Sequence, residues 1–256
     1  MSSLKNKIIL ITGASSGIGE ACARLFASQG AQLILTARRV DRLKALATQL
    51  QSEYGIAHHV HGLDVSDPVA VKTFVETLPM TWQGIDVLLN NAGLALSSDP
   101  VQQGVIDNWE TMIDTNVKGL LYMTRHVLPG MLKRQQGHIV NIGSIAGQEI
   151  YPNGNVYCAS KHAVRALSKS IRLDLMGSPI RVSEIAPGAV ETEFSLVRWQ
   201  DAERAKTFYQ DFTPLSAKDV ADAVFYCISA PPHVNIAEIT ILPTDQRSAN
   251  HIHRRK

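Results

Sequence analysis

The stretch Thr12-Gly13-Ala14-Ser15-Ser16-Gly17-Ile18-Gly19 joins an apolar run, residues 7–12, to a helical pattern at about residues 18–29. Its three glycines lack a Cβ atom, so the backbone there can lie close to a ligand. The helix N-terminus adds free N–H groups and partial positive charge, which attract phosphate. The spacing is G-x-x-x-G-x-G, which differs from the more frequent G-x-G-x-x-G. We expect this turn, with Ser15 and Ser16 in it, to hold the pyrophosphate of a dinucleotide.

Strand-like and helical patterns alternate outward from this turn. Apolar runs of strand length are expected at residues 7–12, 32–37, 57–64, 85–90, 138–142, 180–185 and 235–242. Helical patterns occupy residues 18–29, 41–54, from 68 onward, 106–114, 117–134, 156–176 and 216–229. Strands that alternate with helices at this spacing form a parallel sheet with helices on both faces. The sequence therefore predicts one α/β domain, residues 1–256, with a doubly wound Rossmann-type sheet of about seven parallel strands.

Two segments fall outside this alternation. Residues 187–214 are polar and irregular, and a connection of 28 residues is long for a compact domain. Because such loops often cover active sites, we expect a mobile lid over a substrate. Residues 243–256 form a tail that ends in Arg254, Arg255 and Lys256, which we expect to be a solvated end or a subunit contact.

Composition and charge exclude several classes of partner. The 256 residues include 25 Lys and Arg against 23 Asp and Glu, and the last three residues supply three of the positive charges. A nucleic-acid-binding surface needs clustered basic residues, so we expect no nucleic acid as a partner. No apolar run reaches the roughly 18 residues of a membrane span. The first five residues are few and polar, so we expect no signal peptide.

Cysteines and histidines give no sign of a disulfide framework or a metal site. Cys22, Cys158 and Cys227 are widely spaced. Three histidines cluster within residues 58–61, but their spacing suits no common zinc site and no cysteine or carboxylate completes a set. We therefore expect no bound metal, reduced thiols and a cytoplasmic location.

Arg38 and Arg39 follow the predicted strand 32–37 and bear on which dinucleotide is bound. In dinucleotide-binding folds an acidic residue near this place holds the ribose 2′-hydroxyl, whereas an arginine accommodates a 2′-phosphate. A guanidinium group matches phosphate with paired hydrogen bonds. The sequence therefore predicts NADP rather than NAD as the cofactor, with a solvated helix start as the alternative for the two arginines.

Tyr157 and Lys161 are four residues apart in the predicted helix 156–176 and share one helix face. A tyrosine near its usual pKa of about 10 is a poor base at neutral pH, and a nearby ammonium group lowers that pKa. Ser144 follows the predicted strand 138–142 and can hydrogen-bond a substrate carbonyl. The tyrosine–lysine spacing alone is common. Beside the glycine turn, and with a serine thirteen residues upstream, it indicates an acid–base site.

Together these motifs resemble the short-chain dehydrogenase/reductase family, over residues 7–242. The resemblance implies cofactor contacts from residues that follow several strands: Asp64, Val65, Asn91 within Asn90-Asn91-Ala92-Gly93, Pro187, Gly188, Val190 and Thr192. It also implies that Lys161 holds the nicotinamide ribose and that Asn116 holds a water linking Lys161 to solvent. In oxidation Tyr157, as phenolate, would take the hydroxyl proton while hydride passes to the nicotinamide. Ser144 would orient the same oxygen and stabilise charge on it.

A finer resemblance rests on residues 91–96, 109–116 and 231–236. These stretches are similar to the NADP-dependent 3-hydroxy acid dehydrogenases, also described as serine or L-allo-threonine dehydrogenases. That subgroup implies oxidation of the 3-hydroxyl of small 3-hydroxy acids, or reduction of the matching semialdehydes, by a homotetramer. This chain departs from the subgroup near the substrate: the stretch after Pro187-Gly188 is about one residue shorter, and Glu149 lies where the subgroup tends to be neutral.

A hydroxy-acid substrate would bring a carboxylate into a closed pocket, where an unpaired charge is costly. Among the basic residues of the segment 187–214, Arg198 lies next to Phe194 and Trp199, so we expect it to bind that carboxylate. Arg204 and Lys206 are expected on a solvated helix face, and the same surface is the alternative for Arg198. Two other functions remain open: a broad NADPH-dependent carbonyl reductase, and a non-catalytic cofactor-binding sensor, against which the intact Ser144, Tyr157 and Lys161 argue.

Overall fold

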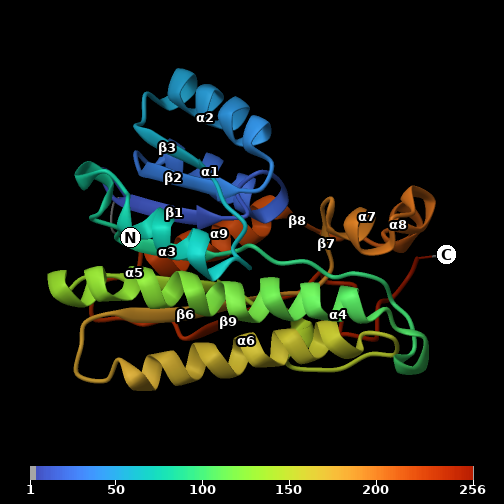
Figure 1. Ribbon diagram of the computed structural model, residues 1–256. Coiled ribbons are helices and arrows are strands. Elements are labelled where there is room, and N and C mark those ends of the chain that lie inside the picture. Colours follow the sequence, from blue (N-terminus) through green and yellow to red (C-terminus); the bar gives the residue numbers. More distant parts are fainter. Residues whose placement is uncertain (1–3, 256) are drawn as a thin grey trace.

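Seven parallel strands form the centre of the chain (Figure 1), whose computed structural model describes residues 4–255. The strand order is β3-β2-β1-β4-β5-β6-β9, and every neighbouring pair is parallel. The strands are β1 (Ile8–Thr12), β2 (Gln32–Ala37), β3 (His58–Gly62), β4 (Val87–Asn90), β5 (His138–Ile142), β6 (Arg181–Pro187) and β9 (Glu238–Ile241). This confirms the predicted doubly wound α/β domain. The predicted limits 1–256 include residues 1–3 and 256, which lie outside the described part.

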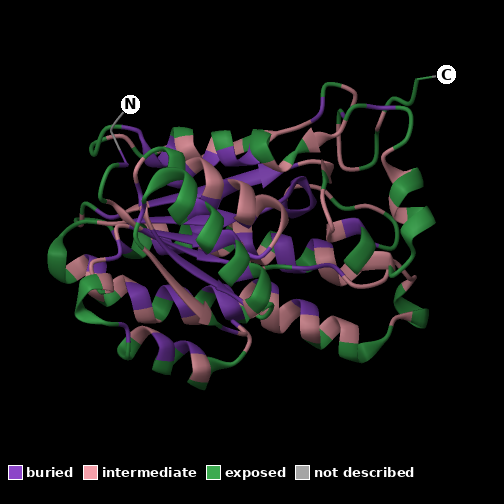
Figure 2. Cartoon of the chain, turned by 90° about the horizontal axis from the view of Figure 1, so that it is seen from above, coloured by how far each residue is buried: buried purple, intermediate pink, exposed green. Residues whose placement is uncertain are grey.

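Helices cover both faces of the sheet. One face packs against α1 (Gly17–Ser28), α2 (Val40–Tyr54) and α9 (Ala217–Ile228). The other packs against α3 (Pro68–Glu76), α5 (Leu120–Arg134) and α6 (Asn155–Asp174). Figure 2 shows that buried residues follow the central strands, whereas exposed residues lie on the outer sides of the helices. The central strands β1, β2 and β4 read as nearly continuous apolar runs because both of their faces are covered.

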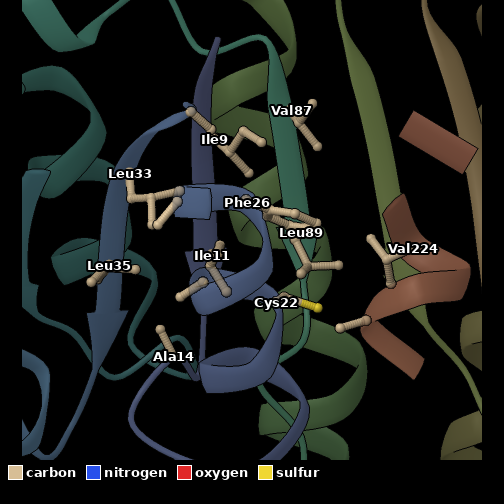
Figure 3. Close-up of a cluster of buried hydrophobic side chains, with 14 of the residues drawn as sticks. Ile9, Ile11, Ala14, Cys22, Phe26, Leu33, Leu35, Val87, Leu89 and Val224 are labelled. Atoms are coloured by element: carbon tan, nitrogen blue, oxygen red, sulfur yellow. The ribbon is translucent and has the colours of Figure 1, made fainter. Parts of the chain in front are cut away.

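The core on the α1 side fixes the helix that follows the glycine turn. Ile9 and Ile11 of β1 pack with Cys22 and Phe26 of α1, and Val224 of α9 closes the same cluster (Figure 3). All five side chains are fully buried. Burial raises the pKa of the Cys22 thiol, so this cysteine acts as a packing residue. The N-terminus of α1, where the glycine turn ends, is thus held on a rigid base.

The chain reverses its winding direction between β1 and β4, which are neighbours in the middle of the sheet. From β1 the chain moves outward to β2 and β3, then returns to β4 and continues in the other direction. In open α/β sheets a crevice forms at such a switch point, outside the carboxyl ends of the strands. The turns after β1, β4, β5 and β6 meet there.

The segment 187–214, predicted to be irregular, contains three short elements: β7 (Val190–Glu191), α7 (Phe194–Trp199) and α8 (Ala202–Phe208). The strand β8 (Leu215–Ser216) follows directly after it and pairs with β7. Phe208 packs on Trp199, Tyr209 and Phe212, with ring centroids 5.0–6.4 Å apart. The prediction of an irregular segment was wrong because contacts between these aromatic side chains hold the segment in short helices. Its mobility stays a prediction.

The helices expected at residues 106–114 and 117–134 form one continuous rod. A π-helical turn, η3 (Asp114–Gly119), joins α4 (Ile106–Ile113) to α5. Three single 3-10 turns complete the described elements: η1 (Met80–Trp82), η2 (Val101–Gln103) and η4 (Ile145–Gly147). An extra residue within a helical turn is often found at functional sites, and the π-turn here contains Asn116.

The C-terminal tail packs against the segment 187–214, at the end of the molecule where α7 and α8 lie (Figure 1). Arg254 donates to the backbone oxygens of Phe208 and Gln210. Arg255 pairs with Asp245 at 2.8 Å. The tail, expected to be a solvated end or a subunit contact, is therefore a structural part of this end of the fold up to residue 255. Lys256 lies outside the described residues.

Candidate active site

A cavity of about 900 Å³ opens at the carboxyl ends of the strands. It collects residues from the turns after β1, β2, β3, β4, β5 and β6, from α6 and α7, and from the tail. The predicted site residues that line it are Gly13, Ser15, Ser16, Gly17, Ile18, Arg38, Arg39, Asp64, Val65, Asn91, Ser144, Tyr157, Lys161, Pro187, Gly188, Val190, Thr192 and Arg198. Gly19 and Asn116 are not among the lining residues, but each contacts a residue that is: Gly19 packs against Gly13, and Asn116 bonds the backbone of Leu94.

The glycine turn has the geometry that the sequence predicts. Gly13 and Gly17 have φ values of +66° and +55°, which favour glycine. A Cβ atom on Gly13 would lie 2.9 Å from Ala92 Cα, and one on Gly19 would lie 2.5 Å from the Gly13 oxygen. No larger residue fits at these two positions, and the cradle that results suits a pyrophosphate at the N-terminus of α1.

Asn91 and Thr12 hold this turn against the end of β4. The Asn91 side chain donates to the Thr12 and Gly13 backbone oxygens, at 2.8 and 3.1 Å. Thr12 Oγ1 accepts from the Asn91 and Ala92 backbone amides, both at 3.0 Å. Asn91, which was expected to contact the cofactor, lines the cavity, and that contact stays a prediction. Its amide group also orders the turn. Thr12 shares this task, which sequence reasoning did not assign to it.

The two predicted arginines lie at the cavity mouth with acidic partners. Arg39 donates to Ser15 at 3.3 Å, to Ser16 at 2.6 Å and to Glu193 at 2.8 Å. Arg42 also binds Glu193, at 2.7 and 2.9 Å. The hydrogen bonds from Arg42 and Arg39 hold the pKa of Glu193 below its usual value. Sequence reasoning missed Arg42 and Glu193.

Arg38 lies beside the acid after the third strand. Its guanidinium is 3.9 Å from the Asp64 carboxylate, and both side chains are largely exposed. Hydrogen bonds from Ser66 outweigh burial and lower the pKa of Asp64. Arg38 and Arg39 therefore face the cavity from one edge, as a phosphate-binding pair would.

Tyr157, Lys161 and Ser144 come together at the inner end of the cavity. Lys161 Nζ lies 5.9 Å from the centre of the Tyr157 ring and donates to the Ile142 oxygen at 2.9 Å. Ser144 lies close enough to the Tyr157 side chain to lower its pKa. Ser144 is held in place because its Oγ accepts from the Ala146 amide at 3.1 Å, which caps η4. The structure thus brings the predicted acid–base trio together.

The electrostatics of the trio differ from expectation in one respect. Burial raises the pKa of Tyr157, and nearby Tyr151 adds to the rise, while Ser144 and Arg198 oppose it. Arg198, whose guanidinium lies 5.8 Å from the Tyr157 ring centre, contributes a positive charge that lowers this pKa. The lowering expected from Lys161, whose Nζ lies 5.9 Å from the same ring centre, stays a prediction. For Lys161, burial lowers the pKa to about 8, and the Glu184 carboxylate opposes the fall.

Asn116 lies in the π-helical turn and binds the segment after β4. Its Oδ1 accepts from the Leu94 amide and its Nδ2 donates to the Leu94 oxygen, both at 2.8 Å. Nδ2 also donates to Ser160 at 3.0 Å. A Cβ atom on Gly93 would lie 3.2 Å from Asn116 Oδ1 and 3.6 Å from Lys161 Nζ. Asn116 and Lys161 therefore flank the same glycine, and a water held between them stays a prediction.

Arg198 covers the other side of Tyr157 from α7. Its Nη1 donates to the Tyr151 hydroxyl at 3.1 Å and its Nε donates to the Ser97 oxygen at 3.3 Å. These two bonds aim the guanidinium into the cavity. Tyr151 lies in a loop without a motif, so no sequence signal could have found it. Arg204, expected on a solvated face, also lines the cavity and donates to Ser98 at 2.7 Å.

Two further features bear on the class of protein. Among residues 4–255 there is no cluster of three or more His, Cys, Asp or Glu side chains arranged to hold a metal. In the same part of the chain, no helix has the length and apolar character needed to cross a membrane.

Comparison with known proteins agrees with this geometry. The model of the short chain dehydrogenase family matches residues 7–203. The NADP-dependent 3-hydroxy acid dehydrogenase YdfG of Escherichia coli (strain K12) is 46% identical over 250 residues, covering 96% of this chain and 99% of that protein. Sulfoacetaldehyde reductase 2 of Chromohalobacter salexigens is also 46% identical, over 241 residues, covering 93% and 95%.

A solved structure gives the same result at the level of the fold. The closed form of serine dehydrogenase complexed with NADP+ matches with a TM-score of 0.90 and 45% identity, covering 97% of this chain and all of that one. The predicted family resemblance, including its finer form, is confirmed. The cradle of glycines, the Ser144–Tyr157–Lys161 site and these matches lead to one conclusion: the chain is an oxidoreductase of the short-chain dehydrogenase family.

Proposed function

We propose that the protein interconverts small 3-hydroxy acids, of the serine, allo-threonine or 3-hydroxypropionate type, with their 3-oxo forms, using NADP. The observation that carries the substrate class is the Arg198 guanidinium, 5.8 Å from the Tyr157 ring centre inside the cavity. Relatives named as NADP-dependent 3-hydroxy acid dehydrogenases, and a serine dehydrogenase structure with NADP+, support it. By resemblance we also expect a homotetramer.

The described residues suit NADP. The glycine cradle fits the pyrophosphate, and Arg38 and Arg39 lie where a 2′-phosphate would need cations. Asp64, Val65, Pro187, Gly188, Val190 and Thr192 complete the walls on which the rest of the dinucleotide would lie. When bound, NADP supplies the hydride acceptor for oxidation and, as NADPH, the hydride donor for reduction.

The chain's own residues handle the proton and the polarised oxygen. In reduction the Tyr157 hydroxyl donates its proton to the substrate oxygen, and in oxidation the phenolate takes that proton back. Ser144 lies beside Tyr157, where it can orient the same oxygen. The Lys161 ammonium group, held by the Ile142 oxygen, completes the site behind the tyrosine ring.

Arg198 gives the site a preference for anions. Its bonds to Tyr151 and Ser97 leave the guanidinium against the reactive tyrosine, where it can pair with a substrate carboxylate. A sulfonate would meet the same cation, and the relative named sulfoacetaldehyde reductase 2 makes that class the second candidate. A broad carbonyl reductase acting on neutral compounds would have no substrate carboxylate to pair with this arginine.

The test is a substrate panel with wild-type enzyme, Arg198→Met and Lys206→Met. The panel holds serine, allo-threonine, 3-hydroxypropionate, sulfoacetaldehyde and a neutral alcohol or aldehyde. Arg198→Met should raise KM for the hydroxy acids at least about tenfold, equal to about 1.4 kcal/mol, and leave KM for the neutral compound nearly unchanged. Lys206 is exposed and does not line the cavity. Lys206→Met is therefore the control that removes one positive charge, and it should change KM for neither the hydroxy acids nor the neutral compound.

Other outcomes separate the alternatives. Equal losses on charged and neutral substrates would make Arg198 structural and favour the broad carbonyl reductase. A preference for sulfoacetaldehyde over the hydroxy acids would favour the sulfonate class. Absence of turnover with every compound, despite tight NADPH binding, would favour the non-catalytic sensor.

A further inference from the structure

Glu184 is a buried carboxylate that the reaction above leaves without a task. It lies in β6 and is 1% exposed. Neither of its carboxylate oxygens has a hydrogen-bond partner among the described residues. A buried carboxylate without a partner destabilises the folded protein, so we expect a nearby positive charge that offsets it.

The position of Glu184 in the strand shows what it faces. Val182, two residues earlier in β6, packs in the same cluster as Val164 and Ile171 of α6. Residues two apart in a strand point to the same face, so Glu184 also faces α6. Glu184 thus lies beneath the helix that carries Tyr157 and Lys161.

A row of cations on α6 faces this carboxylate. Lys161, Arg165 and Lys169 are spaced four apart and all three act electrostatically on Glu184. From the neighbouring strand, Glu238 of β9 lies in register with Glu184 and forms an ion pair with Arg165 at 3.2 Å. Arg165 is therefore shared with Glu238, whereas Lys161 has no ion-pair partner among the described residues.

The contact between Glu184 and Gly143 ties it to the reaction site. A Cβ atom on Gly143 would lie 2.2 Å from Glu184 Oε1. Gly143 directly precedes Ser144, and the residue before it, Ile142, supplies the oxygen that binds Lys161 Nζ at 2.9 Å. The carboxylate therefore packs against the back of the segment that orients both Ser144 and Lys161.

We propose that Glu184 is a positioning residue that supplies the counter-charge for the Lys161 ammonium group and keeps that group protonated near neutral pH. The inference rests on the proposed roles of Lys161 and Tyr157. Lys161 is 6% exposed, and its Nζ donates to a backbone oxygen but directly contacts no carboxylate within residues 4–255. The Glu184 carboxylate, behind the segment 142–144, is therefore the available counter-ion. Gln or any neutral residue at 184 would leave Lys161 buried without one.

The pKa values of the two groups agree with this geometry. Burial, and then the like charge of Glu238, raise the pKa of Glu184 to about 7. Burial lowers the pKa of Lys161 to about 8, and Glu184 opposes that fall. Between these values both groups are charged together. Without Glu184, the pKa of Lys161 falls further and the ammonium group is lost at lower pH.

The experiment compares wild-type protein with Glu184→Gln, Glu184→Asp and Glu238→Gln, each measured from pH 6 to pH 9.5. The first readout is NADPH affinity by fluorescence titration, which reports Lys161 through the ribose. The second is the alkaline limb of kcat/KM for reduction, on whichever compound of the panel turns over. In Glu184→Gln, the alkaline fall of NADPH affinity and the alkaline fall of kcat/KM should both occur at least about half a pH unit lower than in the wild type. Glu184→Asp, which keeps the charge, should restore most of the wild-type position.

Glu238→Gln is the control, because it removes the neighbouring acid that pairs with Arg165. It should leave the alkaline fall of both measurements at the wild-type pH. If the pH profiles of Glu184→Gln coincide with those of the wild type, the proposed function is not affected, while the role of Glu184 is overturned. Equal shifts in Glu184→Gln and Glu184→Asp also overturn it, because they indicate packing rather than charge. A wild-type protein whose NADPH affinity and activity show no alkaline limb overturns the role of Lys161 in the proposed function, and the inference with it.

Discussion

Tyr157 lies where burial keeps the phenol protonated. Its raised pKa keeps the hydroxyl protonated near neutral pH, which is the form that reduction of a carbonyl compound needs. Oxidation needs the phenolate, so the rate of oxidation should rise as pH increases above neutrality. Ser144 and the charge of Arg198 limit the rise in pKa, and both groups therefore help to make one tyrosine serve in both directions.

Tyr157→Phe should abolish turnover in both directions and leave NADPH affinity nearly unchanged. The substitution removes the transferable proton and little else, since the ring still packs at 5.6 Å from Phe194. Stopped assays of NADPH oxidation, with a fluorescence titration of NADPH, check this. Tyr226→Phe, at an exposed position on α9, is the control. A Tyr157→Phe enzyme with near wild-type turnover would mean that another group carries the proton.

Replacing Arg38 and Arg39 together with neutral residues should weaken NADP selectively. Both side chains line the cavity, and losing charged partners of a phosphate costs on the order of a few kcal/mol. NAD, which has no 2′-phosphate, should be affected little. The ratio of kcat/KM for the two cofactors measures this, with Arg24→Met as a control because Arg24 pairs with Glu20 away from the cavity. An unchanged ratio would refute the assignment.

The glycine turn and the tyrosine–lysine pair could be found from the residues alone because their spacing is local, whereas Asp64, Asn91 and Asn116 came only from the family resemblance. Tyr157 and Lys161 are one helical turn apart, and the glycines lie within one turn between a strand and a helix. Glu193 binds Arg39 across 154 residues and Tyr151 binds Arg198 across 47. No periodicity carries such pairings, because loops bring the partners together only once the sheet is complete. Glu184 was missed for a different reason: a single acid within an apolar strand looks like an exception to the pattern.

At the scale of elements, the segment 187–214 and the C-terminal tail form one cover over the cavity. Ala189 donates to Gln246 at 2.8 Å, and the tail's Arg254 holds the backbone of Phe208. The tail in turn binds the loop before α6, because the Ala249 amide donates to Glu149 at 2.8 Å. The sequence predicted a cover from the length of the segment alone. It could not predict that the C-terminal tail forms the other part of the cover, since a polar tail has no pattern that reveals what it packs against.

Limited proteolysis should cut the segment 187–214 first, at Arg204 or Lys206 of α8, which are exposed. Addition of NADPH with a hydroxy acid should slow this cleavage several-fold, because closure over a substrate would order the segment. Mass spectrometry of tryptic fragments over time gives the measurement. An unrelated protein digested with the same additions shows whether trypsin itself is inhibited. Equal cleavage with and without ligands would count against closure.

At the scale of the whole molecule, the centre of the sheet makes stability depend on pH. His138 of β5 is buried and bonds Ser183 at 2.8 Å. Burial, with the charge of Arg181, lowers its pKa from 6.5 to about 3. The unfolded chain therefore takes up a proton below pH 6.5 that the folded protein refuses until about pH 3. The stability due to neutral His138 is present above pH 6.5 and is lost as pH falls toward 3.

His138→Gln should therefore make stability less sensitive to acid. Between pH 7.5 and pH 5 the wild-type protein should lose about 2 kcal/mol of unfolding free energy through this histidine, and the variant should lose less. Urea unfolding at the two pH values measures the difference. His233→Gln, at an exposed position, serves as the control. Equal losses in wild type and His138→Gln would show that other groups set the acid sensitivity.

The pairing of α1 with α9 sets when the protein can fold during its synthesis. Phe26 and Cys22 of α1 are covered by Val224 and its neighbours in α9, which leave the ribosome about 200 residues later. Domains fold as units once their chain is available, and here the unit is closed by α9, the last helix among the described residues. A nascent chain without α9 should expose the apolar side of α1, attract chaperones and fail to retain NADPH on a cofactor resin.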